Sequence, residues 1–369
     1  MDATMKRILL VIFLSLGVTQ LHADTLALKS GHPDTYVVKK GDTLWDISGY
    51  FLNDPWRWPT LWGGNPHIAN PHLIYPGDQL TLVFIDGQPR LVRNKTLLKK
   101  LVEGRVKSKN AAIPAVALSL IQPYLAQNRI VEKTWLEALP MVLGGESPSK
   151  HHIVGDIVYV DTNMPIGEKV AIYVPGREFF QASTDEPLGQ EIILSASGRV
   201  VESGEISKIK LLTNLQETKV GFRVAPVEDQ ALMSALFMPK AAQLTEPTEV
   251  LAIEKDIREV GKLDVVYLDR GKADGIEPGH VFAIYRDGEK IVIGQDGLPV
   301  REIDRSSYDN LVAKFSNDRV YQVPDVFNGN VMVFKVFEKT SMALIMSNAH
   351  PVRVKDKLIT PELKSLRNL

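Results

Sequence analysis

The sequence contains no cysteine and carries almost no net charge. Without cysteine the chain cannot form disulfides, so its stability must come from packing, and every mechanism that uses a cysteine thiolate is excluded. The 43 basic and 44 acidic residues give a formal net charge of -1, which provides no general attraction to nucleic acid. Hydrophobic residues make up 44% of the 369 positions, which is enough for the cores of two or three domains.

The motifs of common hydrolases are missing as well. The chain has no Gly-x-Ser-x-Gly, and no Ser-x-x-Lys accompanied by its companion motifs, so serine catalysis has no support. A zinc peptidase needs three protein ligands around the metal. His152 and Asp156 have the His-x-x-x-Asp spacing, but the His-x-His sequence that would complete such a site is absent. We therefore interpret His151-His152 as the start of a domain, and we predict no catalytic residue, no metal site and no cofactor.

The amino terminus has the pattern of a secretory signal. Lys6-Arg7 precedes the apolar run 8–18, and Leu21-His22-Ala23 is a suitable cleavage tripeptide before Asp24. The apolar run is too short for a comfortable membrane span. We therefore expect residues 1–23 to be removed, which would leave a periplasmic protein without an integral membrane span. A signal that stays uncleaved and anchors the chain is the alternative.

Residues 36–84 predict the order strand, helix, helix, strand. The β-prone run 36–38 ends at Gly41-Asp42, and Thr43 follows as a helix N-cap with Asp46 in the capping-box position. Trp58-Pro59 marks the start of a second helix. A turn at 74–78 then leads into the closing strand 79–84.

This pattern resembles the LysM domain, a module that binds peptidoglycan and chitin. The resemblance depends on Gly41-Asp42-Thr43-Leu44-Trp45-Asp46-Ile47, on the Asn-Pro pairs at 65–66 and 70–71, and on Leu73-Ile74-Tyr75-Pro76-Gly77-Asp78-Gln79-Leu80. Segment 50–62 departs from the shortest LysM form, because it is longer and richer in tryptophan. The resemblance implies a LysM domain at 35–85.

The resemblance also implies a glycan-binding groove between the loop after the first strand and the loop before the second. Its expected residues are Gly41, Asp42, Thr43, Leu44, Pro71, Leu73 and Ile74. Glycine would let the backbone approach an N-acetyl sugar closely, the next two residues would supply amides and side-chain oxygens, and the leucines and isoleucine would contact the acetyl methyl group. Thr43 has a purely structural alternative as a helix cap. Trp45 is expected in the core, and so are Trp56, Trp58 and Trp62, for which stacking on sugar rings at the rim of the groove is the alternative.

The rest of the chain predicts a basic linker followed by β structure. Residues 86–149 are expected to form a solvated linker and a short helical segment, with Trp135 in the core; docking of the basic run on anionic wall polymers or lipid head groups is the alternative. From residue 150 on, short β-branched and aromatic runs are separated by Gly, Pro, Asp and Asn.

Two parts of this β region resemble each other. Residues 157–160 are similar to 265–268, residues 171–174 are similar to 283–286, and 218–239 can be laid over 340–361 without a gap. We therefore predict two related small β-barrel or β-sandwich modules, at 150–240 and 250–362.

The predicted fold class is α+β, with a βααβ LysM module, a short helical linker region and two related small all-β modules. The predicted function is non-catalytic binding of N-acetylglucosamine-containing glycan, that is peptidoglycan, with the β modules as scaffold or as docking units for an envelope protein. The alternatives are a cell-wall hydrolase with an unrecognised site in 150–369, and an envelope assembly or adhesion factor that the LysM module merely tethers.

Overall fold

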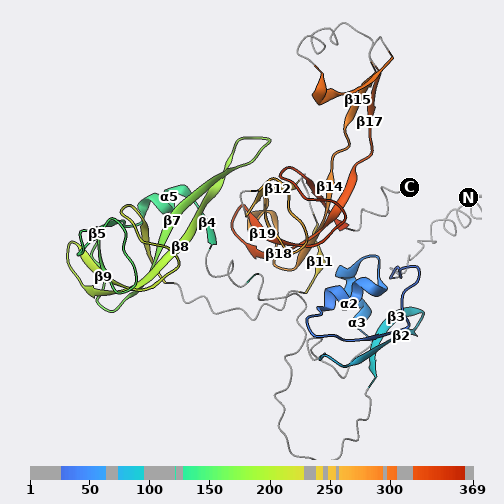
Figure 1. The fold of residues 1–369 in the computed structure, drawn as a ribbon, viewed down its shortest axis with the longest axis horizontal. Coiled ribbons are helices and arrows are strands. Elements are labelled where there is room, and N and C mark those ends of the chain that lie inside the picture. Colours follow the sequence, from blue (N-terminus) through green and yellow to red (C-terminus); the bar gives the residue numbers. More distant parts are fainter. Residues whose placement is uncertain are drawn as a thin grey trace, which may run out of the picture. The chain divides into compact units, whose positions relative to one another are not determined.

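The computed structural model describes residues 26–63, 74–94, 121, 128–227, 238–243, 248–254, 257–293, 297–305 and 319–361. The chain divides into two units, residues 1–113 and 114–369, which we describe in turn (Figure 1). The expected signal peptide and most of the basic linker lie outside the described residues. Within the described ranges, no helix has both the length and the apolar character that crossing a membrane would require.

The first unit contains short helices beside a three-stranded antiparallel sheet of order β1-β2-β3. Its elements are β1 (Thr35–Val37), α2 (Leu44–Phe51), η1 (Pro55–Arg57), α3 (Trp58–Trp62), β2 (Gln79–Ile85) and β3 (Gln88–Asn94). Helix α2 begins after Thr43, whose Oγ1 accepts the Asp46 N–H at 3.1 Å and donates to Asp46 Oδ2 at 2.7 Å. The predicted cap and the strand, helix, helix, strand order are therefore confirmed.

Strand β3 was not predicted, because residues 88–94 were assigned mainly to the linker. The strand pairs with β2 along its whole length, from Gln79 opposite Asn94 to Ile85 opposite Gln88. Asp86 and Gly87 form the turn with φ of 53° and 74°, the left-handed geometry that two-residue hairpins favour. The Asp-Gly pair was the signal for this hairpin, but the basic residues after it favoured a solvated linker.

Four tryptophans fill the core of the first unit. Trp45, Trp56, Trp58 and Trp62 are only 3%, 8%, 2% and 7% exposed, as expected. The expectation for Trp135 is wrong, since this side chain is 40% exposed. It lies on α5 (Lys133–Ala138), where Leu136 takes the buried position. In a helix of this length only one narrow stripe can face the core, and the leucine occupies it.

The second unit begins with a closed barrel, here called the first barrel. Its strands are β5 (Val142–Gly145), β6 (Ile157–Val160), β7 (Lys169–Phe180), β8 (Pro187–Glu202), β9 (Ser207–Asn214) and β10 (Arg223–Pro226). Their order is β10-β7-β8-β9-β6-β5, and β4 (Asn128–Val131) pairs with β8 outside this path. The Val142 N–H donates to the Phe222 carbonyl at 2.8 Å, which joins the two end strands and closes the barrel.

A second barrel follows with the same architecture. Its strands are β12 (Thr248–Ile253), β13 (Val265–Leu268), β14 (His280–Arg286), β18 (Val326–Val336), β19 (Ser341–Asn348) and β20 (Lys357–Ile359). Strand β20 pairs with both β12 and β14 and so closes the ring, while β11 (Lys240–Ala241) runs parallel to β14. The 3-10 helix η2 (Lys272–Asp274) precedes β14.

The connection from β14 to β18 carries a small separate sheet, and we call residues 287–325 the arm. The described part of the arm contains β15 (Lys290–Ile293), β16 (Pro299–Arg301), the 3-10 helix η3 (Glu302–Asp304) and β17 (Arg319–Gln322), with strand order β16-β15-β17. Figure 1 shows β15 and β17 extending away from the barrel strands. The first barrel has a simple hairpin at this place, formed by the far ends of β7 and β8.

The two barrels share their strand order and also details of their hydrogen bonding. The Gly155 N–H donates to Leu211 and the Leu263 N–H to Ile345, at 3.0 and 2.8 Å. The register shifts between β7 and β8 after Ile172, and between β14 and β18 after Ile284. The predicted fold class, with two related all-β modules, is therefore confirmed.

The ungapped overlay of 218–239 on 340–361 is wrong. Equivalent hydrogen bonds align β9 (Ser207–Asn214) with β19 (Ser341–Asn348), and Val224 with Leu358. The difference in residue number between equivalent residues of the two barrels is larger after the arm than before it, because the arm contains more residues than the hairpin in its place. Surface connections change length at little cost in free energy, so a repeat need not keep a constant offset.

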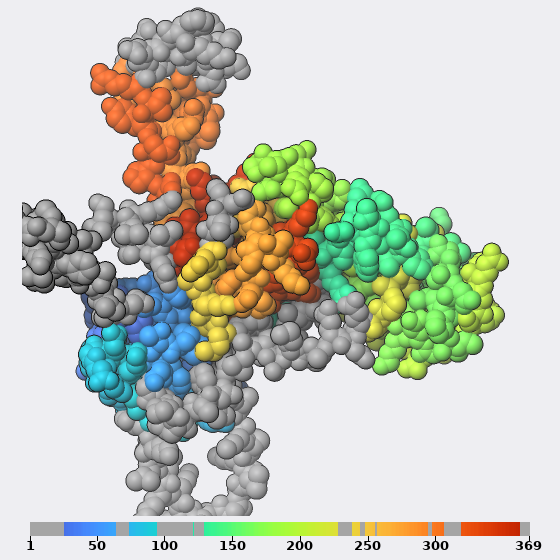
Figure 2. All heavy atoms as spheres, turned by 180° about the vertical axis from the view of Figure 1, so that it is seen from behind, coloured from blue at the N-terminus to red at the C-terminus, as the bar shows by residue number. Residues whose placement is uncertain are grey.

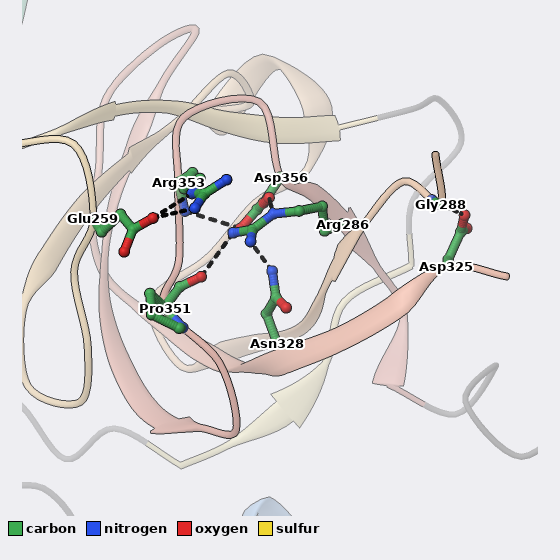
Figure 3. A network of polar contacts seen from close by, with 8 residues as sticks. All are labelled: Glu259, Arg286, Gly288, Asp325, Asn328, Pro351, Arg353 and Asp356. Carbon is green, nitrogen blue, oxygen red and sulfur yellow. Dashed lines mark hydrogen bonds and ion pairs between the residues drawn. The ribbon is translucent and has the colours of Figure 1, made fainter. Parts of the chain in front are cut away.

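A buried polar network holds the base of the arm (Figure 3). Asp356, 3% exposed, accepts hydrogen bonds from Arg286 Nε at 2.9 Å, Arg286 Nη2 at 3.0 Å and Asn328 Nδ2 at 2.8 Å. The Gly288 N–H donates to Asp325 Oδ1 at 3.1 Å, which ties the two ends of the arm together. The base of the arm is therefore joined to the second barrel by charge-assisted hydrogen bonds to the buried Asp356.

Replacing Asp356 by alanine should destabilise the second barrel by about 3 kcal/mol, because Arg286 and Asn328 lose their shared acceptor. The matched control is Glu259→Ala, which removes the exposed Glu259–Arg353 pair and should cost less than about 1 kcal/mol. Hydrogen exchange of the β18 and β20 amides measures the difference. Equal losses in the two variants would contradict the role of the network.

Lys335 on β18 makes the stability of this unit depend on pH. Burial, with a smaller effect from the Arg129 cation, lowers the pKa of Lys335 to about 8. Between that pH and the ordinary lysine pKa of about 10.4, the unfolded chain binds the proton that the folded chain has released. Stability therefore rises with pH across this window.

The thermal midpoint of the wild-type protein should increase from pH 8 to pH 10 relative to that of Lys335→Met, which lacks the titrating amine. Scanning calorimetry of both proteins at the two pH values gives the comparison, and titration of the other lysines and tyrosines cancels in the difference. Parallel pH profiles for the two proteins would show that Lys335 titrates normally.

Candidate functional site

The loop between β1 and α2 is closed by one carboxylate. Asp42 Oδ2 accepts the Lys39 N–H at 2.8 Å and the Tyr36 hydroxyl at 2.9 Å. Burial, followed by the neighbouring Asp42, raises the pKa of Tyr36, so the phenol keeps the proton that it donates. Gly41 is exposed, has φ of 95° and has no atom within 4 Å of the place where a Cβ would lie. The loop is thus held in one shape with the backbone of Gly41 open to solvent.

The second predicted loop is joined to the start of the first by backbone hydrogen bonds. The Val38 N–H donates to the Asp78 carbonyl at 2.9 Å, and the Gly77 N–H donates back to Val38 at 2.8 Å. Asp78 Oδ2 accepts the Tyr75 N–H at 3.0 Å and Arg93 Nη1 at 3.2 Å. Residues 74–78 therefore form a tight turn beside the end of β1, on the side that leads into the Gly41 loop.

The expected site residues differ in what they expose. Gly41 is exposed and Asp42 is half-buried, but Thr43, Leu44 and Ile74 are 8%, 3% and 0% exposed. Pro71 and Leu73 lie outside the described residues. The Thr43 hydroxyl is engaged in the cap of α2, and the side chains of Leu44 and Ile74 belong to the core. The contacts assigned to these residues stay predictions, and the accessible chemistry at this place is mainly that of the backbone.

Helix geometry supplies two backbone donors here. The Asp46 N–H is bonded to Thr43 Oγ1, and the Ile47 N–H donates to the Thr43 carbonyl at 3.0 Å. The N–H groups of Leu44 and Trp45 precede these and have no acceptor within the helix. They directly follow Gly41-Asp42-Thr43 in the chain, and Leu44 and Trp45 are each 3% exposed.

One exposed aromatic ring next to the loop was missed by sequence reasoning. Tyr50 is 51% exposed and stacks on Tyr36, with ring centroids 4.9 Å apart. The tryptophans for which stacking on sugar rings was the alternative are buried. Tyr50 lies on helix α2 among apolar residues. The neighbouring sequence does not show whether a tyrosine at such a position is exposed or buried.

His152, which with Asp156 has the spacing of half a metal site, lies in the first barrel. His152 is fully buried, its backbone pairs with that of Thr218, and its Nδ1 lies 3.9 Å from Asp156 Oδ2. Among the residues that the structure describes, no group of three or more potential ligands could hold a metal ion.

Comparison with known proteins identifies the amino-terminal module. The family model described as LysM domain matches residues 36–83. A 60-residue alignment, which covers 14% of this chain, is 42% identical to the uncharacterized protein YqbP of Bacillus subtilis (strain 168). The match spans 27% of the length of that relative. The chain therefore carries a LysM domain, which confirms the resemblance; LysM is a glycan-binding domain and not a catalytic one.

Removing the cap of α2 should weaken this domain without unfolding it. Thr43→Ala should cost about 1 kcal/mol, because the Asp46 N–H loses its acceptor, whereas Thr43→Ser keeps the hydroxyl and should be close to neutral. Four of the chain's 5 tryptophans lie in the domain core, so fluorescence during urea unfolding reports on it. Equal midpoints for the two variants would show that the cap contributes nothing.

Proposed function

We propose that this protein is a non-enzymatic peptidoglycan-binding protein of the periplasm. The LysM domain would bind N-acetylglucosamine-containing glycan between the loop of Gly41, Asp42, Thr43 and Leu44 and the loop of Pro71, Leu73 and Ile74. The observation that carries the proposal is the LysM match combined with a Gly41 loop that Asp42 holds open to solvent. The secretory pattern of residues 1–23 supports the location.

The groups at the Gly41 loop fit the chemistry of an acetamido sugar. Its acetamido group offers one carbonyl, one N–H and one methyl group. The amides of Leu44 and Trp45 are suitable donors to the carbonyl, and the Gly41 backbone allows close approach. The exposed Tyr50 ring is suited to the apolar face of a pyranose. Specificity would come from a hydrogen bond to every polar group that becomes buried when the sugar binds.

A single shallow site of this kind should bind weakly, with a dissociation constant in the range of about 1 μM to 1 mM. Retention in the wall would then require rebinding or a second contact. The two barrels would supply that contact as scaffold or as docking units for an envelope protein, because linked weak contacts add to one strong attachment. Release of soluble muropeptides from purified walls would instead reveal a hydrolase.

Two glycines of the LysM domain allow a matched test. Gly41 and Gly87 both have positive φ, at 95° and 74°, and both have open space where a Cβ would lie. A leucine at either position should cause a similar strain of about 1–2 kcal/mol. Only Gly41→Leu places a side chain in the proposed groove, so it should lower the affinity for chitin oligosaccharides at least tenfold, while Gly87→Leu should not.

Co-sedimentation of the mature protein with insoluble peptidoglycan, and calorimetric titration with chitin oligosaccharides, measure the two affinities. Equal binding by both leucine variants would place the ligand elsewhere on the domain. Failure of the wild-type protein to bind either material would remove the proposed function itself.

A further inference from the structure

One aromatic side chain on the outer surface of the second barrel is fully covered. Val266 and Leu268 of β13 belong to the core of the barrel, so Tyr267 between them points outward, because side chains alternate along a strand. The exposed fraction of Tyr267 is nevertheless 0%. Its cover must therefore come from outside the barrel.

The first barrel has a tyrosine at the same position without such a cover. Val158 and Val160 of β6 belong to the core of this barrel, so Tyr159 points outward in the way that Tyr267 does. Tyr159 is only half-buried. The complete burial of Tyr267 is therefore not a property of the barrel architecture itself.

The cover of Tyr267 comes from the first barrel. We call residues 175–191, the far ends of β7 and β8 with their turn, the β7–β8 hairpin. The Tyr267 hydroxyl donates to Glu191 Oε1 at 2.5 Å, and the Phe179 ring centroid lies 5.1 Å from that of Tyr267. Glu191 and Phe179 are 3% and 5% exposed. Figure 2 shows the hairpin, in light green, against orange and red atoms of the second barrel.

Arg177 of the hairpin adds bonds to both barrels. Its Nε donates to Glu191 Oε2 at 3.2 Å, and its Nη1 donates to the carbonyl of Ile253 in the second barrel at 2.8 Å. Its guanidinium carbon lies 5.6 Å from the ring centroid of Phe179 and 5.5 Å from that of Tyr267. Charge-assisted hydrogen bonds and cation–π contacts gain strength where water is excluded, as it is at the buried Glu191 and Tyr267.

The tip of the hairpin reaches the second barrel as well. Lys339, in the turn between β18 and β19, pairs with Glu186 at 2.7 Å. Both side chains are exposed, so this pair contributes little to the free energy of the contact. It adds a second point of contact, separate from the buried one at Tyr267.

The hairpin is braced on its own barrel. Strand β4 pairs with residues 190–193 of β8, so this part of β8 lies between β4 and β7. A Cβ at Gly189 would lie 2.7 Å from Ile130 of β4, which shows how closely the two strands pack. Leu136 of α5, Tyr173 and Ile192 share a small hydrophobic core at its base. The hairpin is thus a three-stranded extension of the first barrel and not a free loop.

We infer that the β7–β8 hairpin acts as a latch that fastens the two barrels into one rigid body. Each barrel closes on itself and needs no partner to bury its core, and independent motion is the ordinary expectation for two such domains in one chain. The buried bonds of Arg177, Glu191 and Tyr267 oppose this motion.

Rigidity of the pair has a consequence for binding. A partner that contacts both barrels would not have to immobilise one against the other, which lowers the entropic cost of association. The latch goes beyond the proposed glycan binding and does not depend on it, because all of its residues lie in the second unit.

Distances between spin labels on the full mature chain test the latch, because the natural sequence has no cysteine that would compete for the label. The pair Ile166→Cys and Lys272→Cys places one label on an exposed position of each barrel. The pair Ile166→Cys and Leu215→Cys keeps both labels on the first barrel and gives the width that label motion alone produces. Pulsed electron paramagnetic resonance should give distance distributions of similar width for the two pairs.

Two neighbouring phenylalanines provide matched variants in the background of the Ile166→Cys, Lys272→Cys pair. Phe179→Asp places a carboxylate against the Tyr267 ring, and Phe179 belongs to neither hydrophobic core described for the first barrel. The distance distribution should become at least about twofold wider, because independent barrel motion returns. Phe180→Asp makes the same change at a 43% exposed position and should leave the width unchanged.

Arg177→Ala is the second test of the latch, and it decides alone if circular dichroism shows Phe179→Asp to be unfolded. The Arg177 side chain is 41% exposed, so its loss should widen the distribution without unfolding either barrel. A wild-type distribution that is clearly wider between the barrels than within one overturns the inference. So do distributions that stay narrow in both Phe179→Asp and Arg177→Ala, or a Phe180→Asp variant that widens as much as Phe179→Asp.

Discussion

The closure of each barrel by its last strand is the constraint on which the architecture of the second unit depends. In the first barrel Val142 exchanges backbone hydrogen bonds with residues 221 and 222, and in the second Val250 does the same with residues 355 and 356. A closed barrel leaves no free strand edge and buries its interior side chains without further layers. Variation is then confined to the connections, and the connection between the third and fourth strands is where the two barrels differ most.

That one connection gives the two barrels different surroundings. In the first it is a hairpin whose Arg177 and Glu191 cover Tyr267 of the second barrel. In the second it is the arm, held at its base by Arg286, Asn328 and Asp356. The first barrel has Val174, Ser195 and Phe222 at the corresponding positions, so the buried polar network belongs to the arm and not to the barrel as such.

In the LysM domain, the small core likewise limits which side chains can be exposed. Tyr36, Asp42 and the backbone of Lys39 hold the loop at Gly41, while the tryptophans fill the interior. Because the apolar side chains near the loop are needed for the core of so small a domain, the Gly41 loop exposes its backbone, the Lys39 and Lys40 side chains and the neighbouring Tyr50 ring. A neutral acetamido sugar is the kind of ligand that such a surface suits.

Local sequence determined the features that depend on neighbouring residues. The Thr43 and Asp46 cap, the strand and helix order of the LysM domain, and the equivalent strands at 157–160 and 265–268 of the two barrels could all be predicted. Capping and alternation act over a few neighbouring positions, so the local sequence is enough to show them. Tertiary structure alone decided the exposure of Trp135, the burial of Leu44 and Ile74, and the true register of the repeat. Each of these depends on which distant strand or helix a residue meets, and on loop lengths that cost little free energy to change, so no local pattern records them.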